Sequence, residues 1–382
     1  MRRPPTLSKG YDLYWLFASE RQQIYRRRVE GLPWPVAADP VMAAYRFTNV
    51  YRASDRVSQY LITRVLYDSD RSWTDTFVRV LIFKIFNRID TWEYLQAAIG
   101  EISVTTLRGG GIEEAIAARA SQHPVYSAAY IMPPPRKRLG PKSQRHIALV
   151  REMVSQGAHE RIAEATTMSS AFNVLVSYDS IGPFLAYQFL VDLNYSRHLV
   201  FSEDEFVVAG PGARRGLRKC FADPGDYGVS DMLRWTMDAQ ETAFNDRGLA
   251  WTDLWGRALQ LIDIQNLFCE VDKYSRVACP ELSEFAPGQR IKQRYRPNPE
   301  PLTAWFPPKW GLNERIASPQ WNLANQQNAH PLNNSEDVEF RHLRRFPGDV
   351  LDTSERQLER SPDDDNRDDG STGRHPMADP LM

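Results

Sequence analysis

The stretch SYDSIGPFLAYQFLVDLNYS, residues 177–196, indicates how this chain folds. Gly182 stands directly before Pro183, and proline is favoured at the first position of a helix. The residues that follow, up to Leu193, are apolar on nearly every side, which is typical of a buried helix. Apolar residues at helical spacing also fill the preceding segment, 163–176. The stretch therefore predicts two helices joined by a tight turn.

Helical spacing continues along most of the chain, which predicts a mainly α fold. We expect a long helical run that is capped by Asp39, has Pro40 in its first turn and continues through Tyr60 and beyond. An apolar helical region covers 74–99, with a break at 87–90. Further helices are predicted at 112–120, 143–154, 163–176, 183–193, 213–221, 231–244 and 252–274. Strand-like alternation is rare, and the best candidate is 205–209.

Composition shifts divide the chain into four predicted parts. Three consecutive prolines at 133–135 and the basic loop behind them mark a boundary between helical lobes. The predicted parts are an N-terminal helical lobe (1–132), a C-terminal helical lobe with a hairpin-helix element (133–296), an irregular clasp (297–348) and a disordered acidic tail (349–382). Three tryptophans, Trp305, Trp310 and Trp321, would anchor the clasp to the body.

Length and composition exclude several protein classes. With 382 residues, 42 % of them apolar and 11 % aromatic, the chain can form a packed globular body. No segment reaches the roughly 18 to 20 apolar residues that span a bilayer, so we expect a soluble protein. Three cysteines cannot form an even disulfide framework, which favours a reducing compartment. The seven histidines are scattered, so we expect no metal site and no cofactor.

The charge is distributed unevenly. The formal net charge is −1, but from Asp349 onward ten acidic residues stand against four arginines, a balance of −6 that leaves +5 for residues 1–348. Basic residues also cluster, at 26–28, 136–138, 214–219 and 290–296. Each cluster alone is compatible with a solvated helix end or loop. Four clusters in one otherwise near-neutral body favour a polyanionic partner such as DNA.

The turn at Gly182 is similar to that of a helix-hairpin-helix motif, which binds a DNA backbone. Such a turn has the form h-x-G-h-G, so that backbone N–H groups and the start of the second helix can meet a phosphate. Gly182 supplies the second glycine and Ala186 the alanine behind it, but Ser180 replaces the first glycine. The alternative is a core helix capped by Asp179 or Ser180.

A glycine-rich segment after this helix favours the hairpin interpretation. In helix-hairpin-helix DNA glycosylases a catalytic Asp lies at the corresponding place, but here Gly210 stands there. Gly210-Pro211-Gly212 would instead begin a basic helix whose N-terminus binds anions, although a surface turn is the alternative. The residues expected to contact DNA phosphates are Gly182, Gly212, Arg214, Arg215, Arg218 and Lys219.

A polar stripe on the predicted helix 252–274 is a candidate for chemistry. At about 100° per residue, Asp263, Asn266, Glu270 and Lys273 fall within a sector of roughly 80° on an otherwise apolar helix. Buried carboxylates are costly unless they are paired or used, and two of them can supply a general base and an electrostatic stabiliser. We expect Asp263, Glu270 and Asn266 to be catalytic. The alternative is an internal ion pair between Glu270 and Lys273.

A second stripe, in the run after Asp39, would face the first. Arg46, Asn49, Arg52 and Arg56 recur at spacings of three, three and four. Guanidinium groups along one stripe repel each other unless carboxylates or phosphates face them. We expect a base-binding pocket lined by Arg46, Asn49, Tyr51 and Arg56. The alternative is a structural core in which the arginines pair with Asp263 and Glu270.

Six segments, taken in order, resemble the helical domain of 5-hydroxymethyluracil DNA kinases, a family grouped with DNA base hypermodification proteins. The segments are YRFTNVYRASDRVSQYLI, IFKIFNRIDTWEYL, HPVYSAAYIMPPP, SIGPFLAYQFLVDLNYS, FVVAGPGARRGLRKCF and LIDIQNLFCEVDKYSRV, between about Tyr14 and Tyr295. The resemblance implies a two-lobed helical fold related to thymine pyrophosphorylases and helix-hairpin-helix glycosylases. It also implies action on 5-hydroxymethylpyrimidine-derived bases in DNA. No G-x-x-x-x-G-K-[ST] motif of a P-loop kinase occurs in the chain.

These observations lead to one hypothesis and one alternative. We expect an enzyme that flips a modified base out of DNA and either excises it as a glycosylase, as in defence against phage, or hypermodifies it. Asp263 would act in excision, and either Asp263 or Glu270 would be the general base in hypermodification. The alternative is a non-catalytic module that binds modified DNA for a partner enzyme. The expected location is the cytoplasm, in association with the nucleoid, or the nucleus in a eukaryote.

Overall fold

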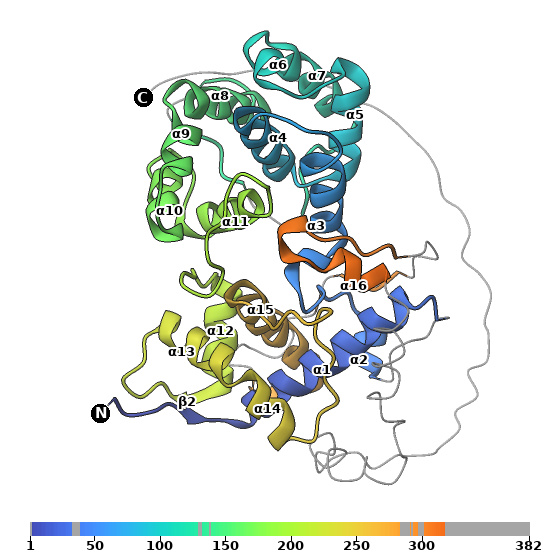
Figure 1. Ribbon diagram of the computed structural model, residues 1–382, viewed down its shortest axis with the longest axis vertical. Helices are drawn as coiled ribbons and strands as arrows, with labels where there is room; N and C mark the ends of the chain where they lie inside the picture. The colour runs from blue at the N-terminus through green and yellow to red at the C-terminus, as the bar shows by residue number, and fades with distance from the viewer. Residues whose placement is uncertain are drawn as a thin grey trace, which may run out of the picture. The chain divides into compact units, whose positions relative to one another are not determined.

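The computed structural model (Figure 1) describes residues 2–32, 39–128, 132–136, 139–282, 291, 293–296 and 302–317. All of these belong to one compact unit, Met1–Pro331. Within them the fold is mainly helical, as predicted, and the strands are limited to one short antiparallel pair, β1 (Thr6–Leu7) with β2 (Phe221–Asp223). None of the helices in these ranges is long and apolar enough to cross a membrane. The acidic tail, Trp321 and parts of two basic clusters (137–138, 290 and 292) lie outside the described residues.

One group of helices is arranged around α4 (Trp73–Phe86), which is apolar on most of its surface and buried. Asn87, in the left-handed conformation with φ 50°, ends α4, so the break predicted at 87–90 is confirmed. The other members of this α4 group are α3 (Arg56–Tyr60), the π-helical turn η2 (Leu61–Leu66), α5 (Ile89–Ile99), α6 (Val104–Arg108), α7 (Gly111–Ala120), α8 (Lys142–Ser155), α9 (Ala158–Ala163), α10 (Met168–Val176) and α11 (Pro183–Asn194).

A second group is arranged around α15 (Leu261–Ala278). Its members are α1 (Lys9–Val29), α2 (Pro40–Ala44), α12 (Pro211–Cys220), α13 (Val229–Asp238), α14 (Gln240–Asp246) and the 3₁₀ turn η3 (Pro280–Leu282). Helix α1 was not predicted, although Tyr11, Tyr14 and Trp15 recur at helical spacing and are all buried against α15 and its neighbours. The Ser8 side chain caps α1 by accepting a hydrogen bond from the Gly10 N–H.

The grouping differs from the two lobes expected on either side of residue 133. Helices α1 and α2, from the first part of the chain, pack in the α15 group, and β1 pairs with β2 behind α12. Helices α8 and α11, from the second part, pack directly on α4. Which helices pack together therefore depends on their apolar faces, and their order along the chain does not predict it.

The prediction of one long helix from Asp39 through Tyr60 is wrong. Asp39 does cap α2, accepting hydrogen bonds from the N–H groups of Val41 and Met42 at 2.8 Å, but α2 ends at Ala44. Residues 45–51 are extended, and a 3₁₀ turn, η1 (Arg52–Ser54), precedes α3. The segment 45–51 is rich in aromatic and β-branched residues, which disfavour helix. Its N–H groups find partners outside a helical ladder instead: that of Arg46 bonds to the Gln293 carbonyl and that of Thr48 to the Glu270 carboxylate.

Three smaller predictions also need correction. The segment 205–209 forms no strand, and the helix expected at 252–274 begins only at Leu261, after a loop with a bridge between Leu254 and Arg257. The region 231–244 contains two helices, α13 and α14, rather than one.

The described part of the predicted clasp, 302–317, contains the 3₁₀ turn η4 (Pro308–Trp310) and α16 (Asn313–Ala317). Gln59 in α3 exchanges two hydrogen bonds of 3.0 Å with the backbone of Trp305. Arg315 donates to the Trp255 carbonyl at 2.9 Å, in the loop before α15. The segment thus contacts both helix groups, which positions η4 beside the site described next.

Candidate functional site

Helices α12 and α15 pack closely because α12 has glycine where it faces α15. A Cβ at Gly216 would overlap the carbonyl oxygen of Phe268, and one at Gly212 would overlap the sulfur of Cys269. Gly212 was predicted to contact a phosphate. The close packing by itself explains why position 212 is a glycine. The Gly212 N–H lies in the first turn of α12, where it has no partner within the helix.

Basic residues of α12 fall into two sets. Lys219 is buried and its ammonium lies 3.0 Å from the carboxylate of Asp272 in α15, with a further hydrogen bond to Ser275. Arg215 also pairs with Asp272, at 2.9 Å. Arg214 and Arg218 are exposed on the other side of the helix. We therefore keep Arg214 and Arg218 as phosphate-binding candidates and assign Lys219 to the core.

The first turns of α11 and α12 lie against each other. Gly210, the residue before α12, is in such close contact with the ring of Phe184 in α11 that a Cβ there would come within 2.7 Å of it. Both helices begin with Gly-Pro, and neither has a side-chain cap, so N–H groups of both first turns have no partner within the helix. Ser180 has φ 68°, the left-handed conformation that the first glycine of the h-x-G-h-G turn would adopt.

Asp263 lies in the first turn of α15 and is only 4 % exposed. Its carboxylate accepts hydrogen bonds from the N–H of Arg52, at 2.8 Å, and from the N–H of Gln260, at 3.1 Å. Burial raises the pKa of Asp263 to about 7, although the two N–H groups partly offset that rise. A carboxyl group with such a pKa can both accept and donate a proton near neutral pH.

The other two predicted catalytic residues differ from Asp263 in their surroundings. Glu270 accepts a hydrogen bond from the Thr48 N–H and forms an ion pair of 2.7 Å with Lys273. This is the internal pair that the sequence left open as an alternative. Asn266 is half-buried on the same helix.

The structure does not bring the four predicted pocket residues together. Arg46 and Arg56 are exposed, the first beside Gln293 and the second in the first turn of α3. Asn49 is tied down by Arg21, at 2.6 Å, and by the Ser54 carbonyl. Tyr51 is buried and donates a hydrogen bond to the Arg257 carbonyl at 2.8 Å. The helical stripe on which these predictions rested is absent because residues 45–51 are extended.

Arg52, from the same expected stripe, turns inward. Its guanidinium lies 2.6 Å from Asp192 in α11, and the ammonium of Lys84 in α4 lies 2.9 Å from the same carboxylate. Burial alone would raise the pKa of Asp192, but the two cations outweigh it and hold that pKa below its usual range. Because the Arg52 N–H binds Asp263, this buried cluster fixes the backbone that holds the carboxylate.

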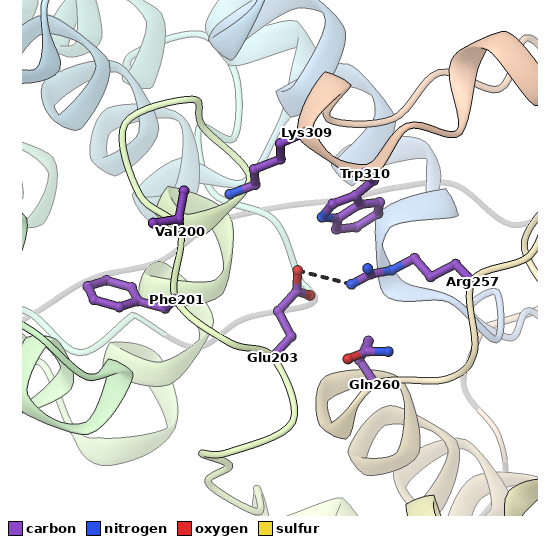
Figure 2. A pocket seen from close by; sticks show the side chains of 7 residues that line it. All are labelled: Val200, Phe201, Glu203, Arg257, Gln260, Lys309 and Trp310. Atoms are coloured by element: carbon purple, nitrogen blue, oxygen red, sulfur yellow. Dashed lines mark ion pairs between the residues drawn. The ribbon is translucent and has the colours of Figure 1, made fainter.

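A pocket of about 300 Å³ opens beside the start of α15. Three segments line it: the loop after α11, the loop that leads into α15, and η4 (Figure 2). The lining residues are Val200, Phe201, Glu203, Arg257, Gln260, Lys309 and Trp310. Its volume is at the lower end of the roughly 300–1,000 Å³ of small-molecule sites.

Charged side chains converge in this pocket and are held in place by neighbours. Arg257 lies 3.0 Å from the Glu203 carboxylate and 3.8 Å above the ring of Trp310 (Figure 2). The ammonium of Lys309 donates hydrogen bonds to two backbone carbonyls at the end of α11 and in the loop after it, those of Asn194 and Leu199. Burial of the ammonium lowers the pKa of Lys309 to about 8, with Glu203 opposing that shift.

Asp263 lies directly behind one wall of the pocket, since its carboxylate binds the N–H of the lining residue Gln260. Sequence patterns did not single out Glu203, Arg257 or Lys309, which lie in the loop after α11, in the loop before α15 and in the short turn η4. Only the tryptophans of the clasp pointed to this part of the chain. No group of three or more metal-ligating His, Cys, Asp or Glu side chains occurs in the described ranges.

Comparison with known proteins establishes the family. The model of the family "5-hmdU DNA kinase, helical domain" matches residues 8–284. The chain belongs to this family. The match includes α11, α12 and α15 but ends before η4, so the pocket is completed by residues outside it.

One curated relative and the solved structures add the following. A protein named 5-hmdU DNA kinase, from Bacillus phage SP10, is 27 % identical over 319 residues. The match covers 77 % of this chain and 49 % of that protein, so the chain spans about half the length of the curated relative. No solved structure matches the chain.

Proposed function

We propose that this family member binds DNA that carries 5-hmdU, takes that base out of the helix and acts on it in base hypermodification. The observation that carries the proposal is the family match over residues 8–284, together with the relative named for 5-hmdU DNA. A kinase is a group-transfer enzyme, which favours hypermodification over excision. The chain has no P-loop motif, so a nucleotide donor would be held by groups other than a P-loop.

Helix starts and exposed arginines support the DNA-binding part of the proposal. The first turns of α11 and α12 lie together, with N–H groups that have no partner within either helix. Such groups, with the positive ends of two helix dipoles, favour phosphate. Arg214 and Arg218 are exposed one turn or more behind the start of α12, where they would extend the contact along the backbone.

Asp263 supports the chemical part. A transfer onto the hydroxymethyl oxygen requires a base that removes its proton, and a carboxylate whose pKa lies near 7 is suited to this at neutral pH. Glu270 is the second candidate, but its ion pair with Lys273 makes it a weaker base. In an excision reaction Asp263 would instead stabilise the positive charge that develops on the sugar.

A second candidate function is a non-catalytic module that recognises modified DNA for a partner enzyme. It is favoured by the fact that Asp263 and Glu270 both accept backbone hydrogen bonds and so have structural roles. In that case Asp263→Asn would leave selective DNA binding and cellular activity intact.

The test is to incubate the purified chain with duplexes that contain 5-hydroxymethyluracil, 5-hydroxymethylcytosine or its glucosylated form, with a nucleoside triphosphate as donor. The products are digested to nucleosides, and the nucleoside masses are measured by mass spectrometry. A heavier 5-hydroxymethyluracil nucleoside that is lost in Asp263→Asn supports hypermodification, whereas abasic sites would mean excision. Selective binding without any product would support the recognition module, and equal binding of all duplexes would refute the proposal.

A further inference from the structure

The pocket at the start of α15 contains two cations and one carboxylate among apolar side chains. Arg257 and Lys309 together exceed Glu203 by one positive charge, which favours a ligand rich in oxygen or carrying negative charge. Val200 and the Trp310 ring supply apolar surface, whereas the Phe201 ring points away from the other lining side chains (Figure 2). A flat, oxygen-rich ring satisfies both requirements, since its faces are apolar and its edges carry acceptors.

The charged groups are fixed before any ligand binds. The Glu203 and Arg257 side chains are only 12 % and 18 % exposed, and Arg257 is held between that carboxylate and the ring of Trp310. An ion pair with so little exposure is weakly screened by solvent, so its charges act strongly on a neighbouring ligand. Preorganised groups of this kind lose little freedom on binding, which increases selectivity.

Lys309 has a donor left for a ligand. An ammonium carries three N–H donors, and two of them bond to the carbonyls of Asn194 and Leu199. No third partner is found among the described residues, and the side chain lines the pocket with its nitrogen on the side of the loop that carries Val200 (Figure 2). The Gln260 amide donates one N–H to the Ala258 carbonyl at 3.2 Å and takes part in the cap of α15, which leaves its second N–H for the edge of a pyrimidine.

The rim of the pocket presents an exposed apolar side chain. Val200 is 83 % exposed, which is unusual for a large apolar residue, and it lines the same pocket. The Lys309 hydrogen bond to the neighbouring Leu199 carbonyl, at 2.6 Å, fixes the loop that carries it. Proteins that distort DNA insert apolar side chains between base steps. Val200 is placed to occupy the space that a displaced base leaves.

We propose that this pocket holds a single extrahelical pyrimidine whose 5-substituent carries oxygen, with Glu203, Gln260 and Lys309 contacting its edge and Val200 filling the gap in the duplex. This inference rests on the proposed function, because it specifies where the 5-hmdU base would bind. It assigns base selectivity to residues of η4 and of the loop after α11, and leaves phosphate binding to α11 and α12.

The test compares the affinities of matched duplexes with one 5-hydroxymethyluracil or one thymine opposite adenine. Glu203→Gln keeps the size of the side chain and removes its charge, and Lys309→Met removes the ammonium. Each should lower the wild-type preference for the modified duplex at least tenfold, while the affinity for the thymine duplex stays within twofold. Arg108→Gln, exposed on α6, which contributes no residue to the pocket, is the control and should keep the wild-type preference.

The outcomes separate the pocket assignment from the proposed function. If the wild type shows no preference between the duplexes, the proposed function fails. If the wild type has a preference that both pocket variants retain, the pocket assignment alone is wrong. A loss of affinity that is equal for both duplexes would mean that the pocket binds a backbone phosphate, which also overturns the assignment.

A fluorescent base placed next to the modified pyrimidine reports on Val200. Wild-type protein should increase its emission by unstacking it, and Val200→Gly should reduce that increase at least threefold while the thymine duplex is bound as before. An unchanged increase would remove Val200 from the proposal. A thermal melt of each variant shows that the fold is retained.

Discussion

Asp263→Asn is the substitution that tests the role of the buried carboxyl group most closely. Asn has nearly the same size and can still accept one of the two hydrogen bonds that the Arg52 and Gln260 N–H groups donate. It carries no charge at any pH. The variant therefore isolates the protonation of Asp263 from most of its packing.

The magnitude follows from the pKa of Asp263, which burial raises from 3.8 to about 7. The folded state binds the proton more tightly than the unfolded state, so the contribution to stability is largest at low pH and is lost as pH rises through about 7. With about 1.36 kcal/mol for each pKa unit, the part of this loss between pH 5 and pH 8 is about 2.5 kcal/mol. Relative to wild type, the free energy of unfolding of the variant should therefore rise by that amount between pH 5 and pH 8.

The assay is urea denaturation of both proteins at several values between pH 5 and pH 8. Asp192→Asn is the control, because the pKa of that buried carboxylate lies below its usual range and should not titrate in this window. It should cost about 3 kcal/mol or more at every pH, with no slope. If the Asp263→Asn difference is constant within about 0.5 kcal/mol, Asp263 does not titrate near neutral pH. Its assignment as a general base would then be wrong.

Three further predictions concern the fold and the DNA-binding surface. Gly216→Ala should lower the free energy of unfolding by about 3 kcal/mol, because the new Cβ would overlap a backbone carbonyl of α15. Gly182→Ala has open space at its Cβ and should change the free energy of unfolding by less than about 1 kcal/mol. Thermal melts distinguish the two variants. Arg214→Gln should reduce the slope of log affinity for DNA against log salt concentration by about one unit. Lys219→Gln should leave that slope unchanged and lower the stability of the fold. Equal slopes for the wild type and both variants would contradict this assignment. Arg52→Met should cost about 3 kcal/mol or more in urea denaturation, because it leaves a buried carboxylate with a single cation, and a cost under about 1 kcal/mol would contradict the role of that cluster.

Periodicity predicted the helices that bury a complete apolar face, and it failed where tertiary contacts decide the backbone. Helices α8 and α11 occur within about two residues of their expected ends, because their apolar residues and caps are local signals. The segment after α2 leaves the helix, and its N–H groups bond to groups far away in the sequence, such as the Gln293 carbonyl and the Glu270 carboxylate. No local pattern contains that information.

The candidate site was predictable to a similar degree. Asp263 could be singled out because a carboxylate in a helix that is apolar nearly all round must have a special environment. Its burial and its raised pKa agree with that argument. Glu203 and Lys309 could not be predicted as neighbours, since they are separated by about a hundred residues, the first in a loop and the second in the short turn η4. Only the fold of the clasp over both helix groups brings them to one pocket.

The measurement that tests the central claim most directly is the ratio of two dissociation constants at one fixed salt concentration. One duplex carries 5-hydroxymethyluracil opposite adenine, and the other carries thymine at the same position. Both duplexes present the same phosphates, so any difference arises from the base. We predict that the modified duplex is bound at least tenfold more tightly, which corresponds to about 1.4 kcal/mol. Equal affinity for the two duplexes would contradict the account.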